Sequence, residues 1–277
     1  MSVVSDIMSC KICSAPVDNW AHAEVLHKYQ VSYFMCSVCG FVNTERPYWL
    51  NEAYSEPIAP SDLGLVSRNL GLAVTADATI RLLFSHEKRF LDFGGGTGLF
   101  VRLMRDRGHD FFWSDEHTKN TFATGFDVGD FAGQRFGLIT AFEVFEHLED
   151  PRPVLEKLLA CTDSVLFTTG LLASPPPKPG EWWYYTLDTG QHISFFTKTS
   201  LHLLARDYGL HFYTSGGLHL LTKKRISRSL FWLASRGRIA RLLNSLIGHR
   251  SLLAADYERM TGSKLGQPGQ GKSRSAQ

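Results

Sequence analysis

Four cysteines near the start of the chain have the residue type and the spacing of a metal site. They form two Cys-x-x-Cys pairs, Cys10 with Cys13 and Cys36 with Cys39, separated by 22 residues. Four thiolates complete a tetrahedral zinc site and leave no position open for a substrate, so the predicted role is structural. A redox role is disfavoured because a thioredoxin-type motif is a single pair that opens a helix. Cys161 has no such neighbour and is expected to be a buried core thiol.

A glycine-rich segment forms the second candidate site. From Leu91 to Gly98 the chain is LDFGGGTG, between an apolar run of strand length and a helical pattern. The glycines at Gly94, Gly96 and Gly98 permit positive φ and let a ligand approach the backbone at a helix N-terminus with free N–H groups. The alternative is a glycine-rich corner that binds no ligand.

An acidic residue is expected at the end of the next strand, where a carboxylate accepts hydrogen bonds from ribose hydroxyls. Asp115 lies 23 residues after Asp92 and fits this position, with Glu116 as the adjacent alternative. The competing interpretation of Asp115 is an exposed carboxylate in a turn.

These residues must be positioned by strands that alternate with helices. Strands are expected at 89–93, 110–113, 136–142 and 164–169, and helices at 65–84, 99–107 and 151–160. This alternation predicts an α/β fold with a Rossmann-like, doubly wound parallel sheet. Ligands bind such sheets at the edge formed by the carboxyl ends of the strands.

Composition divides the chain into four segments. We expect a small zinc-ribbon-like, zinc-binding module at 1–45, a linker and cap helix at 46–88, a cofactor-binding domain at 89–222 and a basic helical tail at 223–277. The end of the tail, beyond Thr261, is rich in Gly, Ser, Gln and Lys and is expected to be disordered.

Three segments resemble motifs of class I S-adenosylmethionine-dependent methyltransferases that act on small molecules. Residues 92–98 (DFGGGTG) resemble their first motif, residues 138–148 (LITAFEVFEHL) their fourth-strand motif, and residues 191–201 (QHISFFTKTSL) a His-x-x-Phe-Phe segment beyond the fifth strand. Some members, including C-methyltransferases acting on nucleotide-linked deoxysugars, also carry an N-terminal four-cysteine zinc module. The resemblance covers roughly residues 8–220.

The resemblance implies a role for each matching residue on the cofactor side. Gly94, Gly96 and Gly98 would contact the methionine and ribose side of S-adenosylmethionine. Asp92 would help to orient the amino group of the cofactor, and Asp115 would hold the ribose.

For the remaining residues the roles that the resemblance implies are less specific. Asp127 or Asp130 would reach the adenine, and Glu143 would lie under the cofactor or the substrate. The chain departs from the sugar C-methyltransferases at Gln191, where a Glu is expected before the histidine, and this puts their specific chemistry in doubt here.

Methyl transfer from a sulfonium mainly requires alignment and exclusion of water, with a base if the acceptor is a hydroxyl or an enolisable carbon. His192 is the favoured base and His147 the second candidate. Each has the alternative of a structural histidine that caps or packs a turn. The aromatic run from Trp182 to Tyr185 is either a substrate wall or an apolar plug over the sheet.

Length, composition and cysteine usage limit the classes of protein to which the chain can belong. At 277 residues and 44% hydrophobic, the chain can bury a full core, and it has no apolar run of 18 residues. Met1 to Ser9 lacks the features of a signal peptide. Paired Cys-x-x-Cys spacing fits metal binding in a reducing compartment, so the cytoplasm is the expected location.

The charge is unevenly spread, with twelve Lys or Arg and two acids from Lys223 to Gln277 and a net acidic remainder. A basic amphipathic helix can lie on an anionic membrane surface or on nucleic acid, or simply pack on the domain with a solvated face. The competing function is therefore a zinc-ribbon nucleic-acid-binding protein or an RNA methyltransferase. The acidic remainder and the lack of an Asn/Asp-Pro-Pro-aromatic signature argue against it. A cofactor binder without activity is a third possibility. The expected partner is a small-molecule methyl acceptor. The sequence does not indicate an oligomeric state.

Overall fold

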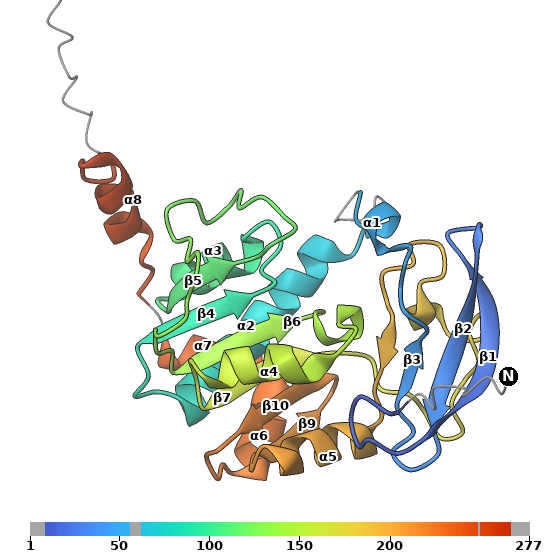
Figure 1. Cartoon of the computed structure of the whole chain (residues 1–277). Coiled ribbons are helices and arrows are strands. Elements are labelled where there is room, and N and C mark those ends of the chain that lie inside the picture. The colour runs from blue at the N-terminus through green and yellow to red at the C-terminus, as the bar shows by residue number, and fades with distance from the viewer. Residues whose placement is uncertain (1–8, 56–61, 249, 267–277) are drawn as a thin grey trace, which may run out of the picture.

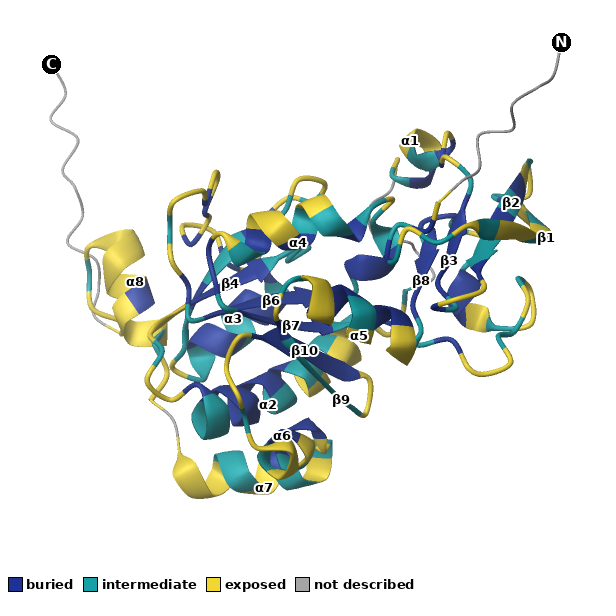
Figure 2. Cartoon of the chain, turned by 60° about the horizontal axis from the view of Figure 1, so that its bottom comes forward, coloured by how far each residue is buried: buried dark blue, intermediate teal, exposed yellow. Residues whose placement is uncertain are grey.

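The computed structural model describes residues 9–55, 62–248 and 250–266. Within them the chain forms two sheets, a six-stranded sheet with helices on both faces and a four-stranded sheet at its side (Figure 1). The larger sheet carries the glycine turn, and the smaller one is built mainly from the cysteine-bearing segment. Figure 2 shows the strands of the larger sheet to be mostly buried.

The six-stranded sheet has the order β5-β4-β6-β7-β10-β9. Its strands are β4 (Arg89–Phe93), β5 (Asp110–Ser114), β6 (Leu138–Phe142), β7 (Ser164–Thr168), β9 (His211–Ser215) and β10 (Leu218–Thr222). The first four are parallel, as predicted, while β10 is antiparallel to both β7 and β9. The predicted α/β fold is confirmed, and the sheet is mixed rather than wholly parallel. A tight turn joins β9 to β10, which is possible only between antiparallel neighbours.

Helices cover the two faces of this sheet. One face carries α2 (Leu65–Leu83) and α3 (Leu99–Asp106), and the other carries α4 (Pro151–Leu159) and α5 (Lys198–Asp207). The sequence predicted α2, α3 and α4 to within a residue or two. Asp150 caps α4 by accepting from the backbone N–H of Arg152, and a proline follows at the first helical position.

The four-stranded sheet has the order β1-β2-β3-β8. Its strands are β1 (Val17–Val25), β2 (Tyr29–Cys36), β3 (Val42–Thr44) and β8 (Ser194–Phe195). The first three form an antiparallel meander, and the short helix α1 (Leu50–Ala53) follows it. The fourth strand comes from the segment directly after His192, so the cysteine-bearing sheet is tied to that histidine by backbone pairing. The pairing crosses the predicted division of the chain at residue 88.

Three helices follow the last strand, namely α6 (Arg228–Ser235), α7 (Gly237–Ile247) and α8 (Leu253–Thr261). The first two pack against α2 through Phe231, Ala234 and Ala240. The third is anchored to α3, where the carboxylate of Asp256 accepts from the guanidinium of Arg105 at 2.7 and 2.9 Å. Most of the expected disordered end, residues 267–277, lies outside the described residues. Among the helices within them, none has both the length and the hydropathy that a membrane crossing requires.

Candidate active site

The glycine turn leaves the carboxyl end of β4 and leads into α3. Gly94, Gly96 and Gly98 all have positive φ, between 53° and 80°, which L side chains rarely adopt. A Cβ on Gly94 would lie 2.6 Å from the side chain of Val144, whereas a Cβ on Gly96 would meet no atom within 4 Å. The turn is therefore packed against the sheet at Gly94 and open at Gly96, as a ligand that approaches the backbone requires.

Asp92 lies under this turn, on β4. Its side chain is buried, and Oδ1 accepts a hydrogen bond of 2.6 Å from the hydroxyl of Thr140 on β6. Burial raises the pKa of the Asp92 carboxyl to about 7, against the opposing effect of the Thr140 bond. The other oxygen faces the position that a Cβ on Gly95 would occupy, at 2.9 Å. A buried carboxyl of this kind would gain from a cationic partner, which would stabilise its charged form.

Asp115 follows β5, as expected for the acid that holds a ribose. Its Oδ2 accepts from the backbone N–H of Gly96 at 2.9 Å, and its Oδ1 accepts from the N–H groups of His117 and Thr118. A carboxylate has about four acceptor positions, so one remains for a further donor. The adjacent Glu116 is exposed and contacts Lys157.

The two aspartates considered for the adenine lie in the loop after β5. Asp127 accepts from the side-chain amide of Asn120 and from the N–H of Gly125, and Asp130 accepts from the N–H of Ala132. Both carboxylates are exposed and stabilise their own loop. The structure gives neither of them a contact with the glycine turn.

Glu143 directly follows β6 and has a φ of 53°. A non-glycine residue in the left-handed region costs about 1 kcal/mol or more, and such strain clusters at functional sites. The strained backbone is fixed by the Glu143 N–H, which donates to the hydroxyl of Thr168 at 3.0 Å. The next residue, Val144, contacts Gly94, so Glu143 stands at the same sheet edge as the glycine turn.

His192 lies before β8, and its ring has a defined hydrogen bond. Nδ1 lies 2.7 Å from the backbone carbonyl oxygen of Tyr184. A carbonyl only accepts, so the proton of the neutral imidazole is on Nδ1 and the lone pair is on Nε2. Burial lowers the pKa of His192 to about 4, which keeps the ring neutral near pH 7.

His147 stands against His192, with the two rings edge to face and their centroids 4.8 Å apart. Its Nδ1 lies 2.9 Å from the hydroxyl of Tyr54 and 3.0 Å from the backbone carbonyl of Gln191. Burial, with the charge of His192, lowers the pKa of His147 to about 3. The structure thus brings both predicted bases together. It also adds Tyr54, from the loop after α1, which no sequence pattern singled out.

Glu146 is a second addition. It lies in the segment matched to the fourth-strand motif, where no sequence pattern indicated a role for this residue. The side chain is fully buried, Oε1 accepts from the hydroxyl of Tyr184 at 2.6 Å, and Oε2 has no hydrogen-bond partner in the part of the chain that the structure describes. Burial, with the charge of Glu143, raises the pKa of Glu146 to about 8. The carboxyl is therefore mostly protonated near pH 7.

The aromatic run divides between the two roles that the sequence left open. Tyr184 and Tyr185 are buried in the core of the four-stranded sheet, and Trp183 is exposed. Tyr184 stacks on Trp182 and also contacts His192, with ring centroids 4.6 Å apart. It therefore belongs to the core and, through Glu146 and His192, to the histidine cluster.

Two groups in the described residues have a ligand set that could hold a metal ion. In the first, the four thiols of the cysteine quartet lie within 4.8 Å of one another, with Cys10 Sγ 3.5 Å from Cys39 Sγ and Cys13 Sγ 3.5 Å from Cys36 Sγ. Four sulfurs around one zinc ion are about 3.8 Å apart, so the quartet fits the ion and is too open for disulfides.

The second group consists of Glu146, His147 and His192, also within 4.8 Å. It lies at the histidine cluster described above, whose nitrogens are also the candidate general bases. A cation there would occupy the lone pairs that a general base needs. The two uses of these atoms are therefore mutually exclusive.

The class of protein follows from this combination of fold and site. The chain has an α/β sheet with an open glycine turn, an acid after the next strand and a histidine cluster at the same edge. A family model described as a methyltransferase domain matches residues 70–214, from α2 to β9. The chain belongs to this methyltransferase domain family. The expected class of enzyme, an S-adenosylmethionine-dependent methyltransferase, is thereby confirmed.

Solved structures similar to this chain include three methyltransferases, each less than 20% identical. Human N-acetylserotonin methyltransferase in complex with SAM has 17% identity and a TM-score of 0.39, over 64% of this chain and 66% of that one. The plantazolicin methyltransferase BpumL in complex with SAH has 16% identity and a TM-score of 0.46, over 72% and 90%. The mitomycin 7-O-methyltransferase MmcR has 13% identity and a TM-score of 0.41, over 62% and 59%.

The match spans less than two thirds of the length of the first and third of these structures. Among curated proteins, no sequence matches this chain closely enough to count as a relative. What the chain methylates must therefore be argued from its own site.

Proposed function

We propose that this protein transfers a methyl group from S-adenosylmethionine to a hydroxyl or an enolisable carbon of a small molecule, such as a sugar, a lipid-linked metabolite or another secondary metabolite. The observation that carries the proposal is the fixed tautomer of His192, whose Nε2 lone pair has no hydrogen-bond partner among the described residues and lies beside a second histidine and a buried carboxyl.

The glycine turn and its acids fit the cofactor. When bound, S-adenosylmethionine supplies an activated methyl group on a sulfonium with a neutral leaving group. The open position at Gly96 admits the ligand to the backbone, and Asp115 keeps one acceptor position for a ribose hydroxyl. Asp92 is the buried carboxyl that would face the cationic amino group.

The histidine cluster fits an acceptor that loses a proton. His192 Nε2 would take that proton as the methyl group is transferred, with a contribution of about 10²- to 10⁴-fold for a general base. Tyr184 orients both His192, through its carbonyl, and Glu146, through its hydroxyl. The aromatic side chains around the cluster, such as Tyr184 and Trp182, would limit the access of water to the reacting groups.

The cysteine quartet supports a zinc ion of structural role. Its core is continuous with that of the larger sheet, since Cys10, Cys36 and Cys39 pack with residues such as Phe145 and Phe196. The ion would hold the antiparallel sheet against the segment that carries His192. Zinc-binding thiols, together with the free Cys161, support a reducing compartment, and the cytoplasm is the location we propose.

The test uses the full zinc-loaded chain. Calorimetry measures whether the protein binds S-adenosylmethionine, and absence of binding would contradict the proposed cofactor. Methyl-labelled cofactor is then supplied with nucleotide-linked sugars, lipid-linked sugars, phenolic metabolites and total RNA. Label in a small molecule supports the proposal. Label confined to RNA would replace it with the RNA methyltransferase alternative, which the exposed basic tail favours.

A further inference from the structure

The helices after the last strand present a surface that the proposed reaction does not use. On α7, Ala240 packs toward α2, and Asn244 donates to the backbone carbonyl of Val74. The opposite side of the helix therefore faces solvent. In Figure 2 the outer parts of α7 and α8 are largely exposed.

Large apolar side chains stand on this solvent side. Leu242 is 60% exposed and Leu246 75%, and Trp232 on the neighbouring α6 is 46% exposed. Leu242 and Leu246 are four residues apart and share one face of the helix. Side chains exposed to this extent bury little apolar area and so add little to the stability of the fold. Two such leucines one turn apart are typical of an interaction surface.

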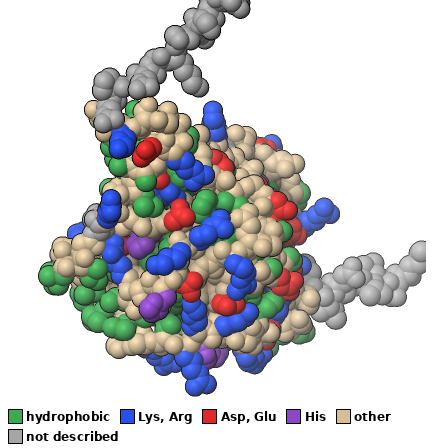
Figure 3. Space-filling view, turned by 90° about the vertical axis from the view of Figure 1, so that its left-hand side faces the viewer, with side chains coloured by type: hydrophobic (Ala, Val, Ile, Leu, Met, Phe, Trp, Pro, Cys, Tyr) green, Lys and Arg blue, Asp and Glu red, His purple; other side chains and the backbone are tan. Residues whose placement is uncertain are grey.

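Basic side chains surround these apolar ones. Between Lys223 and Ala255 the chain has eight Lys or Arg and no Asp or Glu. Arg238 and Arg241 are exposed on α7, with Arg238 one turn before Leu242 on the same face. Among the described residues no carboxylate pairs with Arg225, Arg228, Arg236, Arg238 or Arg241, and Arg236 lies over the ring of Trp232. In Figure 3, hydrophobic side chains gather at the lower left of the face, with Lys and Arg spread beside them.

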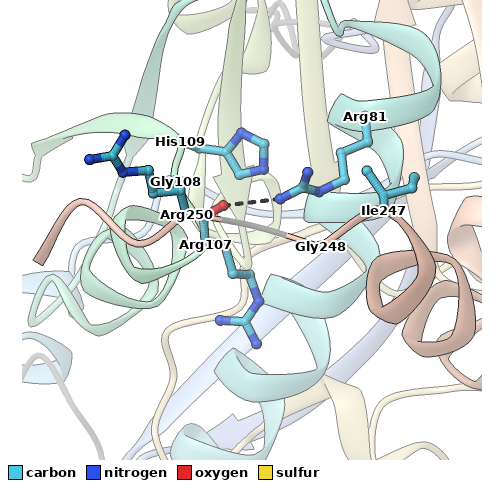
Figure 4. A pocket seen from close by; sticks show the side chains of 7 residues that line it. All are labelled: Arg81, Arg107, Gly108, His109, Ile247, Gly248 and Arg250. Atoms are coloured by element: carbon cyan, nitrogen blue, oxygen red, sulfur yellow. Dashed lines mark hydrogen bonds between the residues drawn. The ribbon is translucent and has the colours of Figure 1, made fainter.

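The basic surface extends past the end of α7 to a cavity of about 450 Å³ (Figure 4). Its lining includes Arg81, Arg107, His109 and Arg250. The three guanidinium groups point in different directions, and that of Arg81 donates to the backbone carbonyl of Arg107. Arg81 and His109 both pair with the buried Asp77, so Arg107 and Arg250 carry the cavity's contribution to the basic surface, and the lining does not form a convergent site for a small anion.

We propose that the solvent face of α6 and α7, called here the α7 surface, docks on an anionic lipid membrane. Leucine and tryptophan side chains can enter the boundary between headgroups and acyl chains, while arginines pair with lipid phosphates. Nucleic acid would use the arginines but would leave Leu242 and Leu246 in water. A symmetric dimer through this surface would bring two sets of unpaired cations together.

The experiment measures binding of the full chain to vesicles. Sedimentation with phosphatidylcholine vesicles containing 30 mol% phosphatidylglycerol is compared with pure phosphatidylcholine, at low and high salt. We expect binding to the anionic vesicles that weakens with salt, and Leu242→Glu/Leu246→Glu is expected to reduce the partition coefficient about 10- to 100-fold. Both side chains are exposed, so the melting temperature and the affinity for S-adenosylmethionine should stay unchanged.

The matched control is Val38→Glu, an exposed apolar residue beside the cysteine quartet, which should bind vesicles like the wild type. Three outcomes would overturn the proposal. They are no binding of the wild type to anionic vesicles, equal loss in the Val38→Glu control, and a concentration-dependent dimer that the double variant abolishes. Retention on RNA that the leucine variant does not weaken, with no vesicle binding, would assign the surface to nucleic acid instead.

Discussion

The backbone carbonyl of Tyr184 lies 2.7 Å from Nδ1 of His192, while the hydroxyl of the same tyrosine lies 2.6 Å from the Glu146 carboxylate. One residue thus sets the tautomer of the proposed base and orients the neighbouring acid. Because Tyr184 is buried, both contacts are held by the core of the four-stranded sheet rather than by a mobile loop. The proposed base and the buried acid beside it are thus held by the same residue.

His192→Ala is expected to lower kcat about 10²- to 10⁴-fold with whichever small molecule accepts the label. The reason is loss of the Nε2 lone pair of the favoured base, and His147, the second candidate beside it, would have to take the proton instead. Affinity for S-adenosylmethionine, measured by calorimetry, should change little. His202→Ala, an exposed histidine on α5, is the control. Near-normal turnover of the His192 variant would exclude it as the base.

Asp92→Asn is expected to affect stability and cofactor binding in opposite directions. The folded-state pKa of Asp92, about 7, is above its unfolded value, so the wild-type protein loses stability as the pH rises from about 4 to 7. Asn can still accept the Thr140 bond and has no charge to bury. The stability advantage of the variant should therefore grow by about 2–3 kcal/mol between pH 5 and pH 8, measured by denaturant unfolding.

The same Asp92→Asn variant should bind S-adenosylmethionine about 10- to 100-fold more weakly, because a charged hydrogen-bond partner of the amino group is lost. Thr140→Val is the useful comparison, since it removes the hydroxyl that contacts Asp92 and keeps the carboxylate. An Asp92→Asn protein with unchanged affinity would show that this carboxylate does not contact the cofactor.

Tyr184→Phe is expected to destabilise the fold by about 1–3 kcal/mol, because it leaves the buried Oε1 of Glu146 without its donor. The double variant with Glu146→Gln should lose less than the sum of the two single variants, since both act on one contact. Tyr257→Phe, on the exposed side of α8, is the control for removing a hydroxyl. Additive effects of the two single substitutions would show that the pair is not coupled.

Cys36→Ser is expected to remove the metal and to lower the melting temperature by about 10 °C or more, because the free energy of zinc binding stabilises the fold. Elemental analysis should find one zinc per wild-type chain and none in the variant. Cys161→Ala, a buried thiol outside the quartet, should keep one zinc. A second ion per chain that disappears in His192→Ala would assign the histidine cluster to a metal and refute its role as a base.

Several parts of the fold could be predicted because their signals are local. The strand, glycine turn and helix at 89–107 depend on an apolar run, on residues that permit positive φ and on the amphipathic pattern that follows, all within about twenty residues. The cysteine quartet could be predicted for the same reason, since the metal ligands of a small zinc module have short, regular spacing in the sequence. Strand β1, which alternates weakly, was missed.

Fewer of the residues that make up the candidate active site could be predicted from the sequence. Tyr54 reaches His147 across 93 residues, and Glu146 reaches Tyr184 across 38. Neither contact has a local pattern, because each depends on how the segment after α1 and the segment before β8 pack on the larger sheet. Glu146 lies within the segment that resembles the fourth-strand motif, but its burial depends on contacts with distant segments.

By itself the sequence determined the type of fold, the glycine turn with its two acids and the clustering of the cysteines, since backbone conformation and ligand spacing are properties of short segments. The tertiary structure decided which nitrogen of His192 carries the proton, how Glu146 comes to be buried, and how β8 joins the cysteine-bearing sheet to the site. Burial and hydrogen-bond partners arise between segments far apart in the chain, and they set the protonation of the groups that the proposed reaction needs.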